Sequence, residues 1–208
     1  MPMMLLDRES NERVEAPEMT PEDLLTLPDS KDYELIDGQL VERAMGELSS
    51  WVGMEIGVLL SNFVKANRLG WVYGSDCGYQ CFAFAPRKVR KPDCSFVSRA
   101  KNPTRPIQAG WIKVVPDLVV EVISTHDVFQ EIDQKVLDYL AAGVGVVWVV
   151  NPFNRTVIVH HSKASAERLS SDQELTGGEV LKGFSCLVDS LFPPPEEVQL
   201  LPRKHRDE

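Results

Sequence analysis

The sequence predicts one α/β (α+β) domain in which helices flank a mixed β-sheet. Residues 117–123 form an almost unbroken apolar run, which is typical of a central strand that is covered on both faces. A helix pattern over 127–142 and a second apolar strand over 144–150 follow it. A strand, a helix and a strand in this order predict two parallel strands joined by a right-handed crossover. Because further strands precede this unit, we expect the sheet to be mixed.

A short helix and a β-hairpin are predicted at the start of the domain. Thr20 is placed to cap the helix, with Asp23 as its capping-box partner. The dipeptide Asp37-Gly38 then separates two short runs of alternating residues within 33–42. This dipeptide between alternating runs is a strong signal for a hairpin.

A long helix and further strands are expected between the hairpin and the central strand. Apolar residues repeat at helical spacing over 50–69, and Gly70 is a suitable stop for that helix. Asp127 is expected to cap the later helix, and Gly143 to end it. The remaining strand-like runs lie at 71–73, 79–85, 93–97 and 156–160, and residues 98–116 are predicted to form a loop.

Length and composition fit a globular domain with short tails. The chain has 208 residues, of which 43% are hydrophobic and 25% are charged. We expect a flexible tail over 1–18, the domain over 19–192 and a proline-rich, charged tail over 193–208. No apolar run approaches the ~20 residues that cross a bilayer, and the N-terminus lacks a secretory signal. The four cysteines have no metal-binding spacing, so we expect reduced thiols in a cytoplasmic protein.

The charge of the chain is strongly acidic overall and basic at one place. A net charge of −9 argues against a protein that coats nucleic acid without specificity, because such binding depends on neutralisation of phosphates by Lys and Arg. One basic run stands directly before Asp93 and consists of Arg87, Lys88, Arg90 and Lys91. This run would suit an anionic substrate such as a phosphodiester. The alternative is a solvated loop, which is the usual role of a run of charges.

Two carboxylates are candidates for a metal site. Glu121 lies inside the apolar central strand, where a carboxylate needs a cation, a metal ion or a proton to offset its desolvation. Asp93 opens a second short strand, so the two side chains can converge at one end of the sheet. Two carboxylates with a carbonyl and waters suit an octahedral Mg²⁺ ion. The alternatives are a buried salt bridge for Glu121 and turn chemistry beside a proline for Asp93.

Helix and strand periodicity predict that two further charged residues lie on the side of Glu121. Lys135 lies at the edge of the buried stripe of its helix, from where its amine can reach over the sheet. The alternative is a lysine whose amine remains in water. Asp117 shares a strand face with Glu121, because side chains alternate along a strand.

A series of motifs follows in one order along the chain, and together they resemble a known family. They are Tyr33-Glu34-Leu35-Ile36-Asp37-Gly38, Arg90-Lys91-Pro92-Asp93-Cys94-Ser95-Phe96-Val97, Pro116-Asp117-Leu118-Val119-Val120-Glu121-Val122-Ile123-Ser124, Lys135 with Tyr139 and Ala142-Gly143-Val144, and Trp148-Val149-Val150-Asn151-Pro152. In this order they resemble the Uma-type family of proposed restriction endonucleases, within the PD-(D/E)XK superfamily. The resemblance covers about residues 19–192 and implies a restriction-endonuclease-like fold with a metal site at one end of the sheet.

The resemblance also implies roles for individual residues. Asp93 matches the metal-binding Asp of the superfamily, and Glu121 matches the acidic residue of the (D/E)XK strand. The lysine that normally follows two residues later is Ile123 here, and the family lysine matches Lys135 on the following helix. Glu34 matches an acidic position of the family.

The functional hypothesis is a Mg²⁺- or Mn²⁺-dependent endonuclease that hydrolyses phosphodiester bonds in DNA, with Glu34 and Asp117 as accessory candidates. Nucleases of this type often dimerise, so a homodimer is a candidate assembly. Two alternatives remain, namely a catalytically silent domain for binding or regulation and a hydrolase of a smaller phosphodiester. The departure at Ile123 and the acidic net charge favour the silent domain. Fold analogy alone is a weak warrant for activity.

Overall fold

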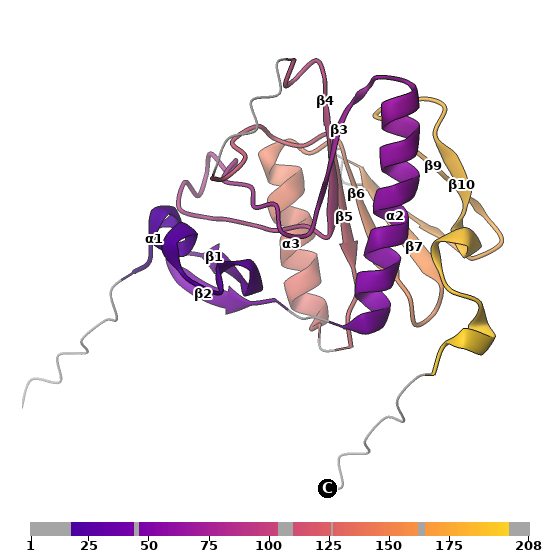
Figure 1. Ribbon diagram of the computed structural model, residues 1–208, viewed down its shortest axis with the longest axis horizontal. Helices are drawn as coiled ribbons and strands as arrows, with labels where there is room; N and C mark the ends of the chain where they lie inside the picture. The colour runs from indigo at the N-terminus through magenta and orange to yellow at the C-terminus, as the bar shows by residue number, and fades with distance from the viewer. Residues whose placement is uncertain (1–17, 44–45, 104–109, 126, 162–164, 200–208) are drawn as a thin grey trace, which may run out of the picture.

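A six-stranded mixed sheet between two helices forms the body of the fold (Figure 1). The computed structural model describes residues 18–43, 46–103, 110–125, 127–161 and 165–199. The sheet has the order β3-β4-β5-β6-β7-β8, and β5 and β6 are its parallel pair. Its strands are β3 (Gly70–Gly74), β4 (Cys94–Ser98), β5 (Leu118–Val122), β6 (Val146–Asn151), β7 (Thr156–His161) and β8 (Ser165–Leu169). The two helices are α2 (Glu47–Ala66) and α3 (Phe129–Ala142). The predicted fold class is therefore confirmed.

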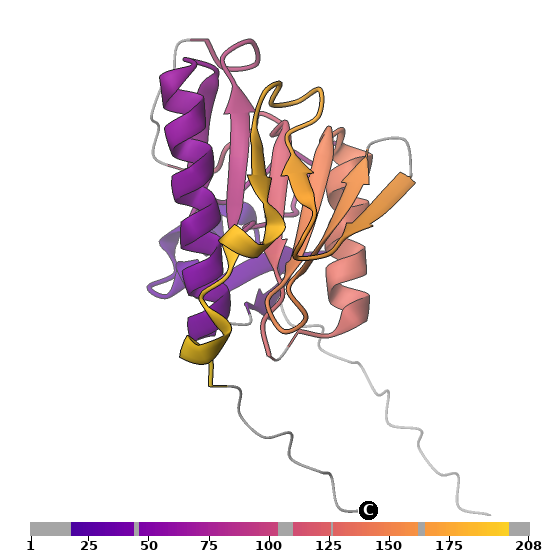
Figure 2. The same cartoon turned by 90° about the vertical axis from the view of Figure 1, so that its right-hand side faces the viewer.

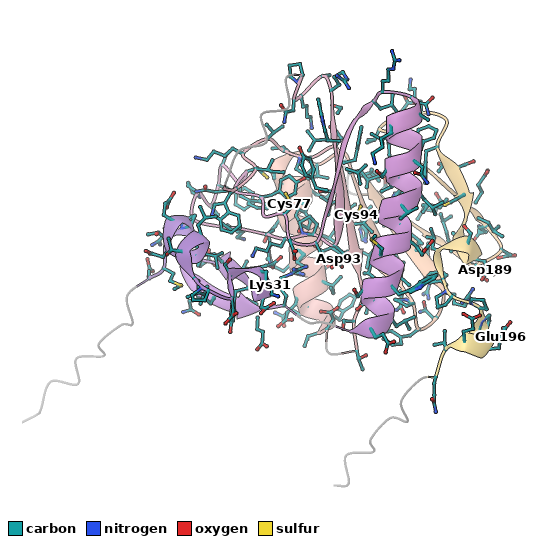
Figure 3. The ribbon with its side chains drawn as sticks, viewed as in Figure 1. Lys31, Cys77, Asp93, Cys94, Asp189 and Glu196 are labelled. Carbon is teal, nitrogen blue, oxygen red and sulfur yellow. The ribbon has the colours of Figure 1, made fainter. Side chains whose placement is uncertain are left out.

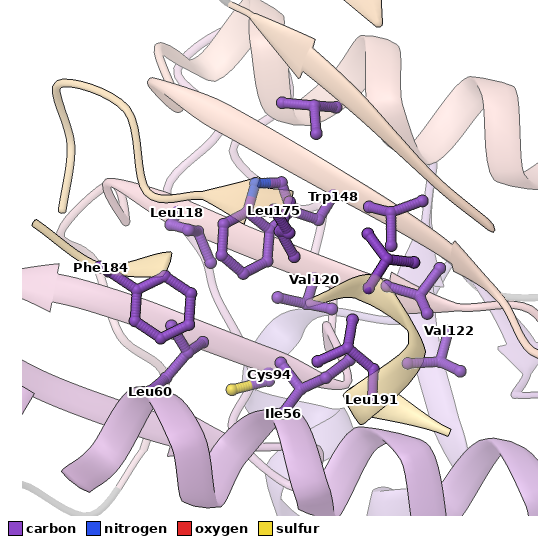
Figure 4. Close-up of a cluster of buried hydrophobic side chains, with 14 of the residues drawn as sticks. Ile56, Leu60, Cys94, Leu118, Val120, Val122, Trp148, Leu175, Phe184 and Leu191 are labelled. Carbon is purple, nitrogen blue, oxygen red and sulfur yellow. The ribbon is translucent and has the colours of Figure 1, made fainter. Parts of the chain in front are cut away.

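The helices cover opposite faces of the sheet, as the turned view shows (Figure 2). Successive residues of β5 point to opposite faces, so Val120 belongs to the apolar cluster on the α2 side and Val119 to the cluster on the α3 side. Figure 4 shows the α2-side cluster, in which Ile56 and Leu60 pack with β5. The predicted central strand is thus buried on both faces, and Glu121 points to the α3 side.

The predicted hairpin is present and lies beside the main sheet. β1 (Tyr33–Ile36) pairs antiparallel with β2 (Gln39–Glu42), and Ile36 lies opposite Gln39 across a two-residue turn. Asp37 and Gly38 have φ of 50° and 79°, as a type I′ turn requires. The preceding helix α1 (Pro21–Thr26) carries the predicted capping box of Thr20 and Asp23. These elements share a small core formed by Leu24, Leu35 and Val89.

Several predicted boundaries are wrong for identifiable reasons. Residues 79–85 are not a strand, because only Tyr79 pairs, through isolated bridges, and a turn follows it. Gly70 does not stop α2 but begins β3, where a Cβ would lie 2.1 Å from the carbonyl oxygen of Val97. Asp127 does not cap α3, because its carboxylate accepts the backbone N–H of Ser124.

Several short elements were not predicted from the sequence patterns. In the C-terminal third they are β8, the antiparallel pair β9 (Glu174–Thr176) and β10 (Ser185–Leu187), and the 3₁₀ turns Val188–Leu191 and Pro195–Glu197. A further 3₁₀ turn, Ser30–Asp32, lies before β1. These runs are too short and too polar to give a periodic signal. The predicted tails lie mostly outside the described residues. Among those described, no helix is long and apolar enough to cross a membrane.

Candidate active site

Asp93 and Glu121 lie at the same end of the main sheet. Cys94 pairs with Val120 across β4 and β5, so extending this antiparallel register by one residue places Asp93 opposite Glu121. The Oδ2 atom of Asp93 accepts the backbone N–H of Val122 at 2.7 Å. Burial is the main cause that raises the pKa of Asp93. Figure 3 labels Asp93 between α2 and α3. The predicted convergence of the two positions is therefore observed, and their role as metal ligands stays a prediction.

Glu121 is a nearly inaccessible carboxylate whose two oxygens have different partners. Its side chain is 2% exposed, Oε2 lies 3.1 Å from the ammonium of Lys135, and Oε1 accepts the hydroxyl of Tyr139 at 2.8 Å. Burial raises the pKa of Glu121 to about 7, and the charges of Asp93 and Glu34 add to this increase. Lys135 and the Tyr139 hydroxyl oppose it. The group is thus short of positive charge even with a lysine in contact.

Lys135 reaches over the sheet, as the sequence predicts. Its ammonium lies between two carboxylates, at 3.1 Å from Glu121 and 3.9 Å from Oε1 of Glu34. Burial acts to lower the pKa of Lys135, but the charges of Glu121, Glu34 and Asp93 outweigh it and raise that pKa. The lysine is therefore a permanent cation. The residue at the usual position of the superfamily lysine, Ile123, packs in the apolar cluster on the α3 side.

Glu34 joins the site from the hairpin and belongs to a buried ion-pair network. Its Oε2 lies 2.8 Å from Arg90, and its Oε1 accepts the backbone N–H of Lys91 at 2.7 Å. Arg90 also contacts Asp138 of α3 through two nitrogens, at 3.0 and 2.6 Å. Burial acts to raise the pKa of Glu34, but Lys135, Arg90 and the Lys91 N–H together hold it below its ordinary value.

The predicted phosphate-binding role of the basic run requires correction. Lys88, Arg90 and Lys91 are buried, so they are not available to neutralise phosphates in solution. Lys88 contacts Asp138 at 2.8 Å, and the ammonium of Lys91 donates to the carbonyl of Ser30. Arg87 is exposed and pairs with Glu18. A run of charges usually lies in solvent, but here two buried carboxylates draw the cations inward.

Asp117 does not join the site. Its Oδ2 accepts the backbone N–H of Ser98 at 2.7 Å, and its Oδ1 lies 3.1 Å from Lys101. Its side chain lies on the same face of the strand as that of Glu121, but a spacing of four residues along the strand separates the two by roughly 13 Å. Asp117 therefore lies apart from Glu121, because sharing a strand face does not imply proximity along the strand. Its role as an accessory ligand stays a prediction that this placement does not support.

Three residues of the site were missed as functional candidates. Tyr139 follows Lys135 by four residues on α3, so helical spacing could have indicated it. Asp138 and Arg43 gave no sequence signal. Arg43 follows β2, and one of its nitrogens lies 3.4 Å from Oδ1 of Asp93. It brings a second cation to the carboxylates, from an element far from them in sequence.

A groove of about 850 Å³ lies between α2 and the edge strand β3 and reaches Asp93. Arg43, Gly46 and small residues of α2 such as Gly53 and Gly57 also line it. A smaller pocket of about 190 Å³ is lined by Arg43, Glu34, Arg90 and Lys135 among others. Arg43 therefore contributes to both openings at the charged cluster.

The donor set fits a divalent cation that keeps part of its water shell. Among the residues that the structure describes, no group of three or more His, Cys, Asp or Glu side chains could hold an ion. Mg²⁺ usually binds through one or two carboxylates, with water and substrate oxygens completing its octahedron. Asp93 and Glu121 carry carboxylate oxygens of the kind that such an ion prefers. An ion held by protein atoms alone does not fit.

Comparisons with known proteins agree with this architecture. The crystal structure of a protein from Anabaena variabilis ATCC 29413, described as a putative nuclease belonging to DUF820, superimposes with a TM-score of 0.70 at 19% identity. The match covers 84% of this chain and 97% of that one, and it shows the fold. No curated protein matches the sequence. The family model Uma2, described as "Putative restriction endonuclease", matches residues 21–189. The chain therefore belongs to the Uma2 family.

Proposed function

We propose that the protein is a metal-dependent endonuclease that hydrolyses phosphodiester bonds in DNA. The observation that carries this proposal is Glu121, a buried carboxylate with a raised pKa that lies opposite Asp93, and Asp93 in turn lines an open groove. A carboxylate with a strongly shifted pKa in a concave site is a candidate functional group. The nuclease family supplies the substrate class.

In this proposal Asp93 and Glu121 hold Mg²⁺ or Mn²⁺. The ion would polarise the scissile phosphate and lower the pKa of the attacking water. Both carboxylates already contact a cationic side chain, Arg43 or Lys135. Each carboxylate oxygen has a second lone pair, so an ion can bind beside these partners. The 3.4 Å contact of Arg43 is long for a charged hydrogen bond and is the easier of the two to displace.

Lys135 has the role of a charged donor near the reacting phosphate. Its ammonium stays protonated, so it stabilises negative charge or orients water rather than accepting a proton. Tyr139 donates to Glu121 and holds that carboxylate in one orientation. Arg43 lines the groove beside Asp93 and is our candidate cation for a substrate phosphate. The chain thus offers two cations and two carboxylates to one anionic substrate.

Nicking of supercoiled plasmid in Mn²⁺ tests the proposal, with the Asp93→Asn and Glu121→Gln variants beside the parent. Both variants should lose nicking by at least about a thousandfold, because metal catalysis supplies several kcal/mol. Asp189→Asn is the matched control, since Asp189 pairs with Arg155 far from the site. Equal nicking by all four proteins would refute the assignment. Replacing the plasmid with a small phosphodiester tests the narrower substrate.

A catalytically silent domain is the second candidate function. It is favoured by the burial of Lys88, Arg90 and Lys91, which leaves an acidic chain with few free cations near the site. It predicts that calorimetry detects no Mn²⁺ binding at neutral pH and that Lys135→Ala changes no property except stability. Mn²⁺ binding that is lost in Glu121→Gln would exclude it. Sedimentation of the parent with and without DNA tests the predicted homodimer.

A further inference from the structure

All three nitrogens of the Arg90 guanidinium contact carboxylates, which come from two different elements. NH1 contacts Glu34 of β1 at 2.8 Å, while Nε and NH2 contact Oδ2 of Asp138 at 3.0 and 2.6 Å. Arg90 is 5% exposed, so these bonds are shielded from water. Asp138 lies on α3 three residues after Lys135. Arg90 therefore fastens the hairpin to the helix that carries the lysine of the site.

The position of Lys135 depends on how strongly its two carboxylates compete for it. The ammonium contacts Glu121 at 3.1 Å and Glu34 at 3.9 Å. Glu34 is otherwise balanced by Arg90 and by the N–H of Lys91, whereas Glu121 has only a neutral hydroxyl besides Lys135. A buried carboxylate that loses its cation attracts any remaining cation strongly, because its charge is poorly screened. Without Arg90, Glu34 would become the stronger partner.

We propose that Arg90 is a positioning residue that neutralises Glu34 and so leaves the ammonium of Lys135 on Glu121. This inference rests on the proposed nuclease function and gives Arg90 a role in place of phosphate contact. The residue acts through Glu34 and touches no substrate. Asp138 serves as its anchor, and Lys88 at 2.8 Å balances the remaining charge of that anchor.

The test is a pair of variants, Arg90→Gln and the double variant Arg90→Gln/Glu34→Gln, in the Mn²⁺ nicking assay. Arg90→Gln should lower kcat by about 100-fold, the cost of misplacing a site group by about 1 Å. Removing the competing carboxylate in the double variant should restore kcat by about tenfold. KM for DNA and its salt dependence should remain those of the parent. The additional Glu34→Gln substitution should restore activity only if the unpaired carboxylate of Glu34 causes the loss of kcat in Arg90→Gln.

Two results would overturn the proposal. If Arg90 contacts phosphate, Arg90→Gln raises KM, reduces the salt slope by about one and is not rescued. If its role is only structural, kcat per folded molecule equals that of the parent. Arg155→Gln is the matched control. Arg155 donates to Oδ1 of Asp189 from Nε and NH2, at 2.9 and 2.5 Å, as Arg90 donates to Asp138, but it lies away from the site. This control variant should leave kcat unchanged. If Arg90→Gln does not fold, Arg90→Lys decides instead. It keeps a positive charge beside Glu34, so kcat should stay near that of the parent, and a loss of about 100-fold would overturn the proposal.

Crystal structures of the two variants test the role of Arg90 independently of nuclease activity. In the structure of Arg90→Gln, the ammonium of Lys135 should lie nearer to Glu34 than to Glu121, and in the double variant it should return to Glu121. This readout requires no activity. If the parent nicks no DNA, the proposed function fails and the lysine position still decides the role of Arg90. An ammonium that stays on Glu121 in Arg90→Gln refutes that role.

Discussion

Glu34 and Glu121 are buried to almost the same extent, with 1% and 2% of each side chain exposed, and they share the ammonium of Lys135. Their pKa values are nevertheless shifted in opposite directions, downward for Glu34 and upward for Glu121. Glu34 has a second cation, Arg90, and a backbone N–H. Glu121 has one cation and faces Asp93 as well as Glu34.

The difference shows that charge balance rather than burial decides the direction in which the pKa of each carboxylate is shifted. On the Glu34 side, each buried anion is matched by Arg90 or Lys88, and the network ties the hairpin to α3. On the Glu121 side, Lys135 is shared between Glu121 and Glu34, and Arg43 lies 3.4 Å from Asp93. The carboxylates there are less completely neutralised, so the region gains from an added positive charge. A divalent ion would supply that charge. The comparison supports the proposed metal site on grounds that are independent of the family.

The largest expected effect on stability comes from removing a charge from the ion-pair network of Glu34 and Arg90. Glu34→Gln leaves Arg90 with one carboxylate partner fewer and should lower the free energy of unfolding by about 3 kcal/mol. Glu121→Gln removes an anion from an overcrowded site and should change it by less than about 1 kcal/mol. Urea unfolding at pH 7 measures both. The control is Glu179→Gln, an exposed partner of Lys182 that should have no effect. Equal losses for both site variants would contradict the comparison.

The next effect is the pH dependence of metal binding. Because burial raises the pKa of Glu121, an incoming ion must displace a proton at acidic pH. Mn²⁺ affinity should therefore rise by about tenfold per pH unit below that pKa and level off above it. Calorimetric titration at several pH values between 5 and 8 measures this. Affinity rises rather than falls with pH, because Glu121 in the folded metal-free protein holds a proton that the metal must remove. An affinity independent of pH would show that Glu121 is not a ligand.

The smallest effect concerns the neutral partner of Glu121. Tyr139→Phe removes the hydroxyl that donates to Oε1 at 2.8 Å while keeping the packed ring. The carboxylate loses one orienting bond, so we expect Mn²⁺ affinity to fall by about tenfold, as for other residues that orient metal ligands. Tyr33→Phe on β1 provides a control with the same chemical change. Unchanged affinity in Tyr139→Phe would mean that Lys135 alone orients the carboxylate.

Prediction from sequence succeeded where a local pattern determines the structure. The apolar runs of β5 and β6 and the helix between them predicted the parallel pair, and Asp37-Gly38 predicted the hairpin turn. The positions of Asp93 and Glu121 at one end of the sheet followed from strand alternation and register. The strand prediction for 79–85 failed, because alternation in a segment without a continuous partner produces only isolated bridges.

The sequence by itself determined the sheet, the family and the two carboxylates that meet beside Lys135, because periodicity and motif order are local properties of the chain. Only the tertiary structure decided what the remaining charges do. It turned Lys88 and Arg90 inward toward Asp138, placed Asp117 at the far end of its strand and brought Arg43 to Asp93. These outcomes depend on which buried charges lie within a few ångströms of one another. Such distances join residues that are tens of positions apart, and no spacing in the sequence encodes them.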